Sequence, residues 1–272
     1  MPAAVPMIKK WARQSLPVRW HYALRHMVRS EEAPDELKLI QLAVSSIRNG
    51  VMIDVGAHYG TTSSPFLDKG WKVVGFEPDS KNRAILTRDY GKHPNFTMDS
   101  RAVSNHENPA LTLYRSDVSS GISSLEGFHP SHTAAETVCV TTLNKALTEH
   151  KVDKIDVLKV DTEGYDLFVL QGLDMSRIPV RVVMTEFEER KTKSLGYTPT
   201  DLVNYLVAQG FKVVISIWEP ITEYGHQHKW RSFSPYPCEI DPLCWGNVLG
   251  FYKEDDRIEF LRLASKYKWY QA

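Results

Sequence analysis

Two acidic residues at the ends of successive apolar segments carry the clearest chemical signal in this chain. The first segment, VMIDVGAHYG over 51–60, reaches Asp54 and then turns through Gly56 and Gly60. The second, WKVVGFEPD over 71–79, reaches Glu77. A glycine turn after one strand and an acid at the tip of the next are typical of doubly wound α/β proteins that bind a nucleoside. The turn lets backbone amides approach the ligand, and the acid accepts both ribose hydroxyls.

The side chains of the first turn indicate which nucleoside. A dinucleotide needs bare backbone N–H groups for its pyrophosphate, but His58 and Tyr59 occupy those places here. An anionic Asp54 repels phosphate and suits a ligand that carries an ammonium and a sulfonium. The turn therefore predicts S-adenosylmethionine, with an NAD-linked oxidoreductase or a non-catalytic nucleoside-binding module as alternatives.

Further acids follow the other predicted strands. Asp99 and Ser100 follow the third, Asp161 the fourth, and Glu186 ends the fifth. Ligands bind beyond the carboxyl ends of such strands, so we expect these side chains to face one crevice. Each could instead cap a helix, as Asp and Ser often do. Glu163 either joins Asp161 at the reaction face or begins a helix, where the dipole favours an acid.

Methyl transfer to a hydroxyl defines the chemistry that these acids could perform. The acceptor oxygen must be held behind the methyl group, and a base must take its proton. The candidates for the base are Asp161, Glu163 and Glu186, with His226 or His228 as a weaker alternative. The three acids could also bind a divalent metal, which we do not favour. Zinc is not expected, because the spacing of His226, His228, Cys238 and Cys244 fits no familiar pattern.

Apolar periodicity predicts the elements that position these residues. Helices are expected over 33–48, 61–69, 79–90, 164–172 and 199–208. Strands are expected over 51–55, 72–77, 95–98, 155–160, 180–186, 211–217 and 247–252, the last two as a closing hairpin, and 110–114 and 136–142 also alternate like strands. The alternation predicts an α/β fold with a doubly wound, mostly parallel, seven-stranded sheet.

Length and charge bound the organisation of the chain. Its 272 residues carry a formal net charge of zero, which implies no basic face, so nucleic acid is not expected as a partner. We expect a helical N-terminal extension over 1–48 and a catalytic domain over 49–272. The extension mixes basic and aromatic residues, as membrane-surface helices do, but Pro17 interrupts it. Packing on the domain or on a sister subunit is expected instead, which leaves a homodimer open.

The expected compartment is the cytoplasm. No signal peptide and no membrane-spanning stretch is visible in the sequence. The three cysteines are an odd number without C-x-x-C spacing, so we expect them to be reduced.

Several ordered motifs resemble one family. VMIDVGAHYG, VVGFEPD, RAVS, VTTL and LKVDTEGYDLFVLQG are similar to motifs of the FkbM-type family of class I, S-adenosylmethionine-dependent methyltransferases, and the resemblance covers about 50–190. It implies that Asp54, Gly56 and Gly60 shape the loop around the methionine part of the cofactor, and that Glu77 binds the ribose. Asp99 or Ser100 would lie beside the adenine, and Asp161 under the amino and sulfonium region. His58, on the same loop, is also expected at the cofactor, but it stands where many members carry asparagine, so its particular contacts stay open.

The resemblance also implies the reaction. Members commonly methylate hydroxyl groups of sugars, glycan ends or polyketide-type natural products, so O-methylation of such an acceptor is the expected activity. An N-directed or protein-directed methyltransferase is the alternative. The aromatic segment 218–246 would cover the acceptor pocket or, equally, form a packed plug or dimer contact.

Overall fold

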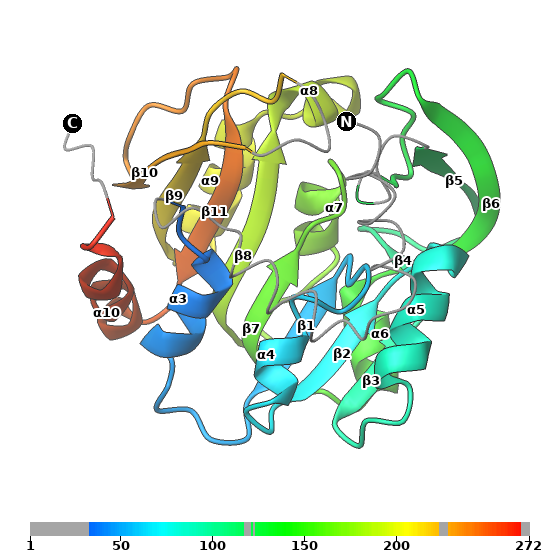
Figure 1. Ribbon diagram of the computed structural model, residues 1–272, viewed down its shortest axis with the longest axis horizontal. Coiled ribbons are helices and arrows are strands. Elements are labelled where there is room, and N and C mark those ends of the chain that lie inside the picture. Colours follow the sequence, from blue (N-terminus) through cyan, green and yellow to red (C-terminus); the bar gives the residue numbers. More distant parts are fainter. Residues whose placement is uncertain (1–32, 117–120, 122, 223–227, 268–272) are drawn as a thin grey trace, which may run out of the picture.

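A central, twisted sheet organises the molecule. The computed structural model describes residues 33–116, 121, 123–222 and 228–267. Within them, eight strands pair in the order β10-β9-β11-β8-β7-β1-β2-β3 (Figure 1). Their bounds are β1 (Val51–Val55), β2 (Lys72–Phe76), β3 (Phe96–Asp99), β7 (Ile155–Val160), β8 (Val180–Glu188), β9 (Lys212–Trp218), β10 (Trp230–Pro235) and β11 (Trp245–Phe251).

The strand directions confirm the predicted fold class and correct the strand count. The strands β3, β2, β1, β7 and β8 are parallel, whereas β11 runs antiparallel between β8 and β9. The predicted seven strands are all present. The eighth, β10, lies within the segment interpreted as a loop over 218–246 and pairs antiparallel with β9. It forms because Trp230 and Phe233 bury their rings against the sheet.

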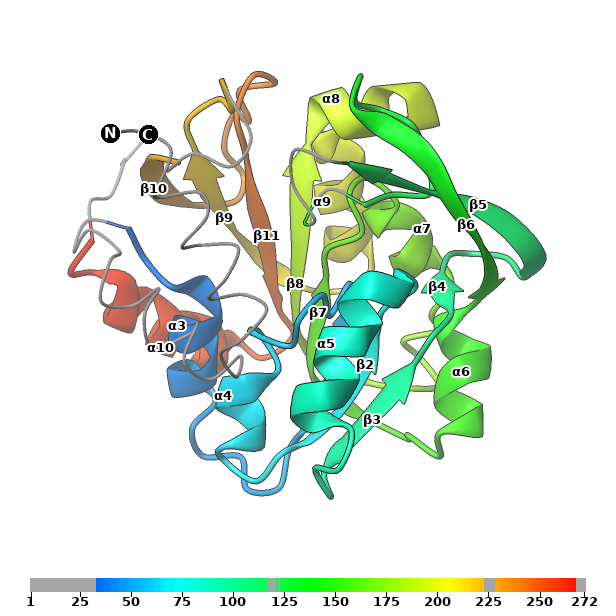
Figure 2. The same cartoon turned by 45° about the vertical axis from the view of Figure 1, so that its right-hand side comes forward.

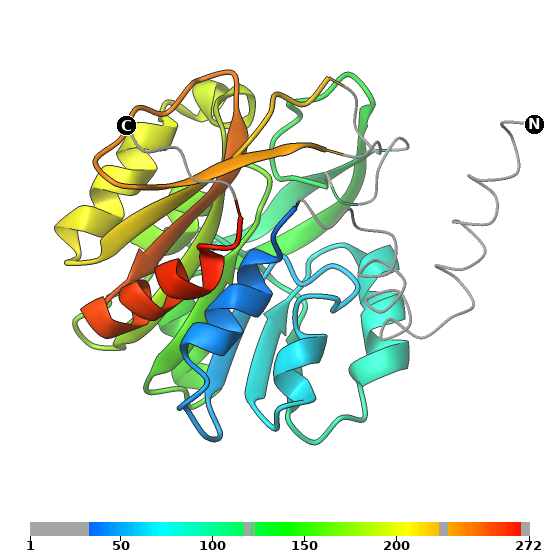
Figure 3. The ribbon, with the colours of Figure 1, turned by 60° about the vertical axis from the view of Figure 1, so that its left-hand side comes forward.

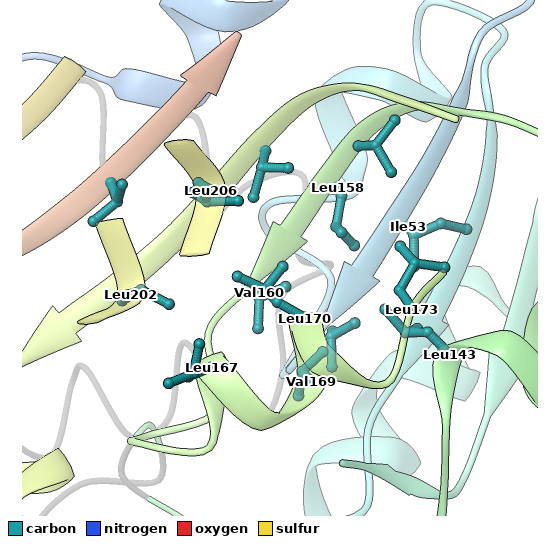
Figure 4. Close-up of a cluster of buried hydrophobic side chains, with 14 of the residues drawn as sticks. Ile53, Leu143, Leu158, Val160, Leu167, Val169, Leu170, Leu173, Leu202 and Leu206 are labelled. Carbon is teal, nitrogen blue, oxygen red and sulfur yellow. The ribbon is translucent and has the colours of Figure 1, made fainter. Parts of the chain in front are cut away.

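Helices cover both faces of the sheet. On one face lie α6 (Leu143–Glu149), α7 (Asp166–Gln171) and α9 (Pro199–Ala208), and on the other α3 (Glu36–Ala43), α4 (Ser64–Leu67), α5 (Ser80–Tyr90) and α10 (Glu254–Ala264). Figure 4 shows the first layer, where Leu167, Leu170 and Leu206 pack on Leu158 and Val160. The helices α3 and α10 lie side by side (Figure 3). Both core faces remove large apolar surfaces from water, which is the main source of stability.

A smaller sheet stands beside the carboxyl ends of β1, β2 and β7. It contains β4 (Ala102–Val103), β5 (Asn108–Ser116) and β6 (His132–Thr141) in the order β4-β6-β5. Figure 2 shows its long β5–β6 hairpin arching from the end of β3 past α7 toward α8 (Glu189–Thr192). The sequence indicated both long strands but not their place over this edge.

The helix expected over 33–48 is shorter in the structure and is part of the folded domain. Glu36, in the first turn of α3, is buried and accepts hydrogen bonds from Ser216 Oγ and Trp218 Nε1, both at 2.9 Å. The rest of the expected N-terminal extension, 1–32, lies outside the described residues. No helix of the described part is long and apolar enough to cross a membrane.

Candidate active site

The loop after β1 is held between the ends of β2 and β7. Gly56 N and Ala57 N both donate to the carbonyl oxygen of Phe76, at 3.0 and 2.9 Å. Gly56 has a φ of +78°, and a Cβ there would lie 1.9 Å from the carbonyl oxygen of Asp161. Only glycine fits so close an approach in this backbone conformation. The loop therefore brings the tips of three neighbouring strands together.

Glu77 is fixed by backbone donors rather than by a cation. His58 N donates to Oε2 at 2.7 Å and Asp79 N donates to Oε1 at 2.9 Å. The residue is only 4% exposed, and burial raises the pKa of Glu77 to about 7, against the lowering effect of these hydrogen bonds. Both oxygens keep lone pairs for further donors such as ribose hydroxyls.

A cavity of about 280 Å³ opens at these strand tips, close to the lower end of the range of about 300–1,000 Å³ for small-molecule sites. It brings together five of the predicted site residues: Gly56, His58, Glu77, Asp161 and Glu163. Asp54, Gly60, Asp99, Ser100 and Glu186 are not among the described residues that line it. The opposite wall comes from the smaller sheet and the segment after β5, through Val103, Leu113, Ser124 and Leu125.

The Asp54 carboxylate is turned into the protein. It is fully buried and accepts hydrogen bonds from Thr62 Oγ1 and Ser63 Oγ, both at 2.6 Å. Lys159 Nζ lies 3.2 Å from its other oxygen. The sequence interpretation placed a bare negative charge against the ligand, whereas the structure compensates that charge within the fold.

Gly60 has a packing role. Its φ is +81°, and a Cβ at this position would lie 2.8 Å from Leu86 Cδ1 and from the Tyr90 ring. The glycine thus allows α5 to pack closely on the loop, at a distance from the cavity wall. Its contribution to a ligand site is indirect, through the path of the loop.

Lys159 is a site residue that the sequence reasoning missed. From the carboxyl-terminal part of the buried strand β7, it donates to the carbonyl oxygen of Gly56 at 2.7 Å and lies 3.5 Å from Asp161 Oδ2. Burial works to lower the pKa of Lys159, but Asp54 and Asp161 override it, so the pKa is raised and the side chain is charged. The motif LKVDTEGYD contained this lysine, but nothing in it indicated that Asp54 was the partner.

At the end of β3, the cavity wall is formed by Arg101 rather than by Asp99 or Ser100. Arg101 donates to both carboxylate oxygens of Asp99, and His150 Nε2 lies 2.9 Å from Oδ2. Ser100 is exposed. Asp99 therefore orients the guanidinium that lines the cavity.

Asp161, Glu163 and Glu186 do come together, as predicted. One carboxylate oxygen from each lies within 4.8 Å of the other two. The Lys191 ammonium sits among them, 2.6 Å from both Glu163 Oε2 and Glu186 Oε2. Because this ammonium already contacts two of the three carboxylates, we assign no metal to them.

Glu163 combines backbone strain with an altered acidity. Its φ is +56°, an uncommon conformation for a residue other than glycine that is often found at functional sites. Burial raises the pKa of Glu163 to about 7, against the opposing effect of Lys191. Burial also raises the pKa of Glu186 well above its usual range.

The β5–β6 hairpin is fastened over the cavity by a partly buried ion pair. Arg115 Nε lies 2.6 Å from Asp79 Oδ2, and its Nη2 lies 2.5 Å from Glu136 Oε1. Asp79 also caps α5 by accepting from Lys81 N at 2.8 Å. Further along, Ser124 Oγ donates to the carbonyl oxygen of Glu163 at 3.0 Å. The hairpin thus contacts both the nucleoside side and the acidic side of the cavity.

The aromatic segment 218–246 lies elsewhere. Trp218 and Trp245 stack with their ring centroids 5.3 Å apart, and His228 lies edge-on to Trp245. None of its described residues lines the cavity. His226 lies outside the described residues, and Cys238 and Cys244 form no disulfide.

Together, the strand order, the glycine turn and Glu77 at the tip of β2 define a Rossmann-like, class I methyltransferase fold. The family model described as the methyltransferase FkbM domain matches residues 54–213, which is more than half of the chain, and the protein belongs to this family. It is an S-adenosylmethionine-dependent methyltransferase. The NAD-linked and non-catalytic alternatives are therefore wrong.

Solved structures with a similar architecture are distant in sequence. A precorrin-6y C5,15-methyltransferase from Geobacter metallireducens is 11% identical, with a TM-score of 0.44 over 83% of this chain and 93% of that one. An rRNA methylase from Streptococcus thermophilus is 8% identical, with a TM-score of 0.43 over 83% and 100%. A TehB-like methyltransferase from Corynebacterium glutamicum is 11% identical, with a TM-score of 0.43 over 91% and 100%. No curated protein sequence matches this chain.

The residues at the cavity fit this cofactor. Glu77 offers carboxylate oxygens for a ribose diol, and the close turn at Gly56 leaves room beside the strand tips. Asp161, whose side chain is 41% exposed, offers a carboxylate to an ammonium or a sulfonium. Val103 and Leu113 supply an apolar wall for the adenine ring of the cofactor.

Proposed function

We propose that the protein transfers a methyl group from S-adenosylmethionine to a hydroxyl group of a sugar, glycan or natural-product acceptor. One observation carries the proposal: Asp161 and Glu163 line the cofactor cavity together, and the pKa of Glu163 is raised to about 7. A carboxylate with a pKa near the working pH is well suited to act as a general base. An alcohol needs such a base, because it must lose its proton as the new bond forms.

We assign the cofactor contacts to the residues of the strand tips. Glu77 accepts the ribose hydroxyls, and the turn through Gly56 and His58 encloses the methionine part. Asp161 faces the amino and sulfonium region. Asp54 and Gly60 do not contact the cofactor but fix the path of the loop. Arg101, oriented by Asp99, lies beside the adenine, the position that was expected for Asp99 or Ser100.

The bound cofactor supplies an electrophilic methyl group for in-line displacement. Glu163 accepts the proton from the acceptor hydroxyl, and Asp161 orients that hydroxyl within the same cavity. Glu186 acts through Lys191, which it shares with Glu163. The β5–β6 hairpin excludes water from the opposite side, since its segment reaches Glu163 through Ser124. Positioning of this kind can supply up to roughly 7–11 kcal/mol of barrier reduction in ideal cases.

The proposed class of acceptor rests on the net charge of the chain and on the carboxylates at the cavity. A net charge of zero favours a small molecule or glycan over nucleic acid, because binding to phosphates depends on basic side chains. The buried carboxylates favour an oxygen nucleophile over an amine, which needs less help to lose its proton.

A direct acceptor screen tests the proposal. The purified chain is incubated with S-adenosylmethionine and three acceptor sets: hydroxylated sugars and natural products, amines with peptides, and RNA. Release of S-adenosylhomocysteine and the added mass of one methylene are measured in each set. We expect turnover in the hydroxyl set only, and a loss of about a hundredfold or more in kcat for E163Q. Turnover confined to the amine or RNA set would overturn the proposal.

A further inference from the structure

One ammonium group serves two buried glutamates in this site. Lys191 Nζ lies 2.6 Å from an oxygen of Glu163 and 2.6 Å from an oxygen of Glu186, and its side chain is only 2% exposed. Glu188 lies 3.3 Å away, but it has a second cation in Arg190, 2.6 Å from its carboxylate. The Lys191 charge is therefore divided between Glu163 and Glu186.

The groups around this pair add more negative charge than positive. Asp161 lies on the loop after β7 and shares Lys159 with Asp54. Asp166, at the start of α7, is buried and accepts from Gly164 N and Thr185 Oγ1. Tyr197, after the short helix η2 (Lys193–Leu195), is neutral, because burial raises its pKa. Two lysines thus face the five carboxylates Asp54, Asp161, Glu163, Asp166 and Glu186.

Excess negative charge in a buried site is relieved by a bound proton. Close carboxylates that cannot all be ionised share a proton between them, and it belongs to the pair rather than to either residue. Burial acts on both Glu163 and Glu186 in this direction, and so does repulsion from Asp161 and Asp166. Glu186 is also repelled by Glu163. The Phe128 ring, 5.9 Å from Lys191 Nζ, covers the lysine on the side of the β5–β6 hairpin.

We propose that Glu163 and Glu186 share one exchangeable proton beside Lys191, and that binding of the cationic methyl donor in the adjoining cavity expels this proton into solvent. S-adenosylmethionine carries one net positive charge, because its sulfonium adds to a zwitterionic amino acid, whereas S-adenosylhomocysteine carries none. Glu163 lines this cavity, and a positive charge brought close to a carboxyl shifts its ionisation constant roughly tenfold or more. The donor therefore ionises Glu163 and the product does not.

The proton shared by Glu163 and Glu186 can be followed through the catalytic cycle. The proton that leaves on donor binding goes to solvent, which leaves Glu163 as a carboxylate. If the acceptor is a hydroxyl, as in the proposed function, Glu163 then takes its proton when the new C–O bond forms. The product sulfur is neutral, so the protonated pair is restored. The base is thus ionised only while the donor is in place.

Calorimetry without any acceptor tests the inference independently of the proposed function. Each ligand is titrated into the full chain at about pH 7 in two buffers of different ionisation enthalpy, and the number of protons released is taken from the difference in heat. We expect S-adenosylmethionine to release about half a proton more than S-adenosylhomocysteine. Glu77 contacts the ribose that both ligands share, so its contribution cancels in this difference.

Two variants and a control locate the proton. E163Q and E186Q each leave Lys191 with one glutamate, so the excess release with the donor should disappear in both. K193M, at an exposed lysine two residues from Lys191, should keep the wild-type value. Equal release with the two ligands, or an unchanged excess in both glutamine variants, would overturn the inference. A protein that shows the excess but methylates no hydroxyl would retain the inference and lose the proposed function.

Discussion

Lys159 on β7 and Asp54 on β1 form a buried ion pair, with 3.2 Å between Nζ and Oδ1 and side chains that are 4% and 0% exposed. The same ammonium donates to the carbonyl oxygen of Gly56. The pair therefore joins two adjacent strands and fixes the loop that turns into the cofactor cavity. The Asp54 carboxylate therefore stabilises the fold and does not face the ligand cavity.

Removal of the Lys159 ammonium should lower the free energy of unfolding. K159M leaves Asp54 buried with its hydroxyl donors but without its cation, and such a change costs about 3–5 kcal/mol. We expect that loss in urea unfolding. The double variant D54N/K159M removes both charges and should recover part of it. A single variant as stable as the wild type would show that Asp54 does not depend on Lys159.

The close approach of Gly56 to the backbone of Asp161 predicts that alanine is much more destabilising at Gly56 than at Gly70. Gly56 and Gly70 both have a positive φ, but a Cβ at Gly70 would meet nothing within 4 Å. G70A should therefore cost only about 1 kcal/mol from backbone conformation. G56A adds a collision with backbone and should cost about 3 kcal/mol or more, with loss of cofactor binding. Equal unfolding free energies for the two variants would contradict this account.

Glu77 should control cofactor affinity without controlling the fold. E77Q keeps the shape of the side chain but removes its charge and turns an N–H group toward backbone donors or the ribose. We expect the Kd for S-adenosylhomocysteine, measured by calorimetry at about pH 8, to rise about 10- to 100-fold. E107Q, at an exposed glutamate paired with Lys145, is the control. Unchanged affinity in E77Q would remove Glu77 from the ribose site.

The strands could be predicted because their burial is nearly continuous. The segment 155–160 is buried at every position, and β7 has the bounds that were predicted for it. Signals were weaker where few apolar residues face the core. The helices α6 and α10 and the edge strand β10 were missed, and the helix expected over 61–69 is only the four-residue α4.

The acids of the site were also visible in the sequence, but their partners were not. Asp161 and Glu163 share one motif, so their proximity followed from the chain itself. Lys191 reaches Glu163 because the chain turns from β8 into α8, and Arg115 reaches Asp79 because the hairpin folds over the cavity. Contacts of this kind depend on the path of the backbone, which no local spacing encodes. The sequence therefore identified the carboxylates of the site but not the lysine and arginine side chains that pair with them and influence their pKa values.

The ion pair that fastens the hairpin should matter for ligand binding. R115M leaves the buried Asp79 and the neighbouring Glu136 without their shared cation. We expect the Kd for S-adenosylhomocysteine to rise about tenfold, together with faster amide exchange in β5 and β6. R262M removes an exposed arginine that pairs with Glu259 and should change neither. A rigid hairpin in R115M would show that packing alone holds it over the cavity.

Glu163 should impose a pH dependence on stability, and its sign follows from burial. The pKa of Glu163 is about 7 in the folded protein, above the ordinary glutamate value of 4.5 that applies in the unfolded chain. The folded state therefore binds more protons between these two pH values. The unfolding free energy therefore falls as the pH rises from about 4.5 to 7, by up to about 3 kcal/mol from this group. E163Q cannot ionise at this position, so its stability relative to the wild type should increase across the same interval and level off above about pH 7. Urea unfolding of both proteins at several pH values measures this difference, which cancels the titrating groups remote from Glu163. A constant difference across the interval would mean that Lys191 keeps Glu163 fully ionised in the folded protein, and Glu163 would then hold no proton for the methyl donor to displace.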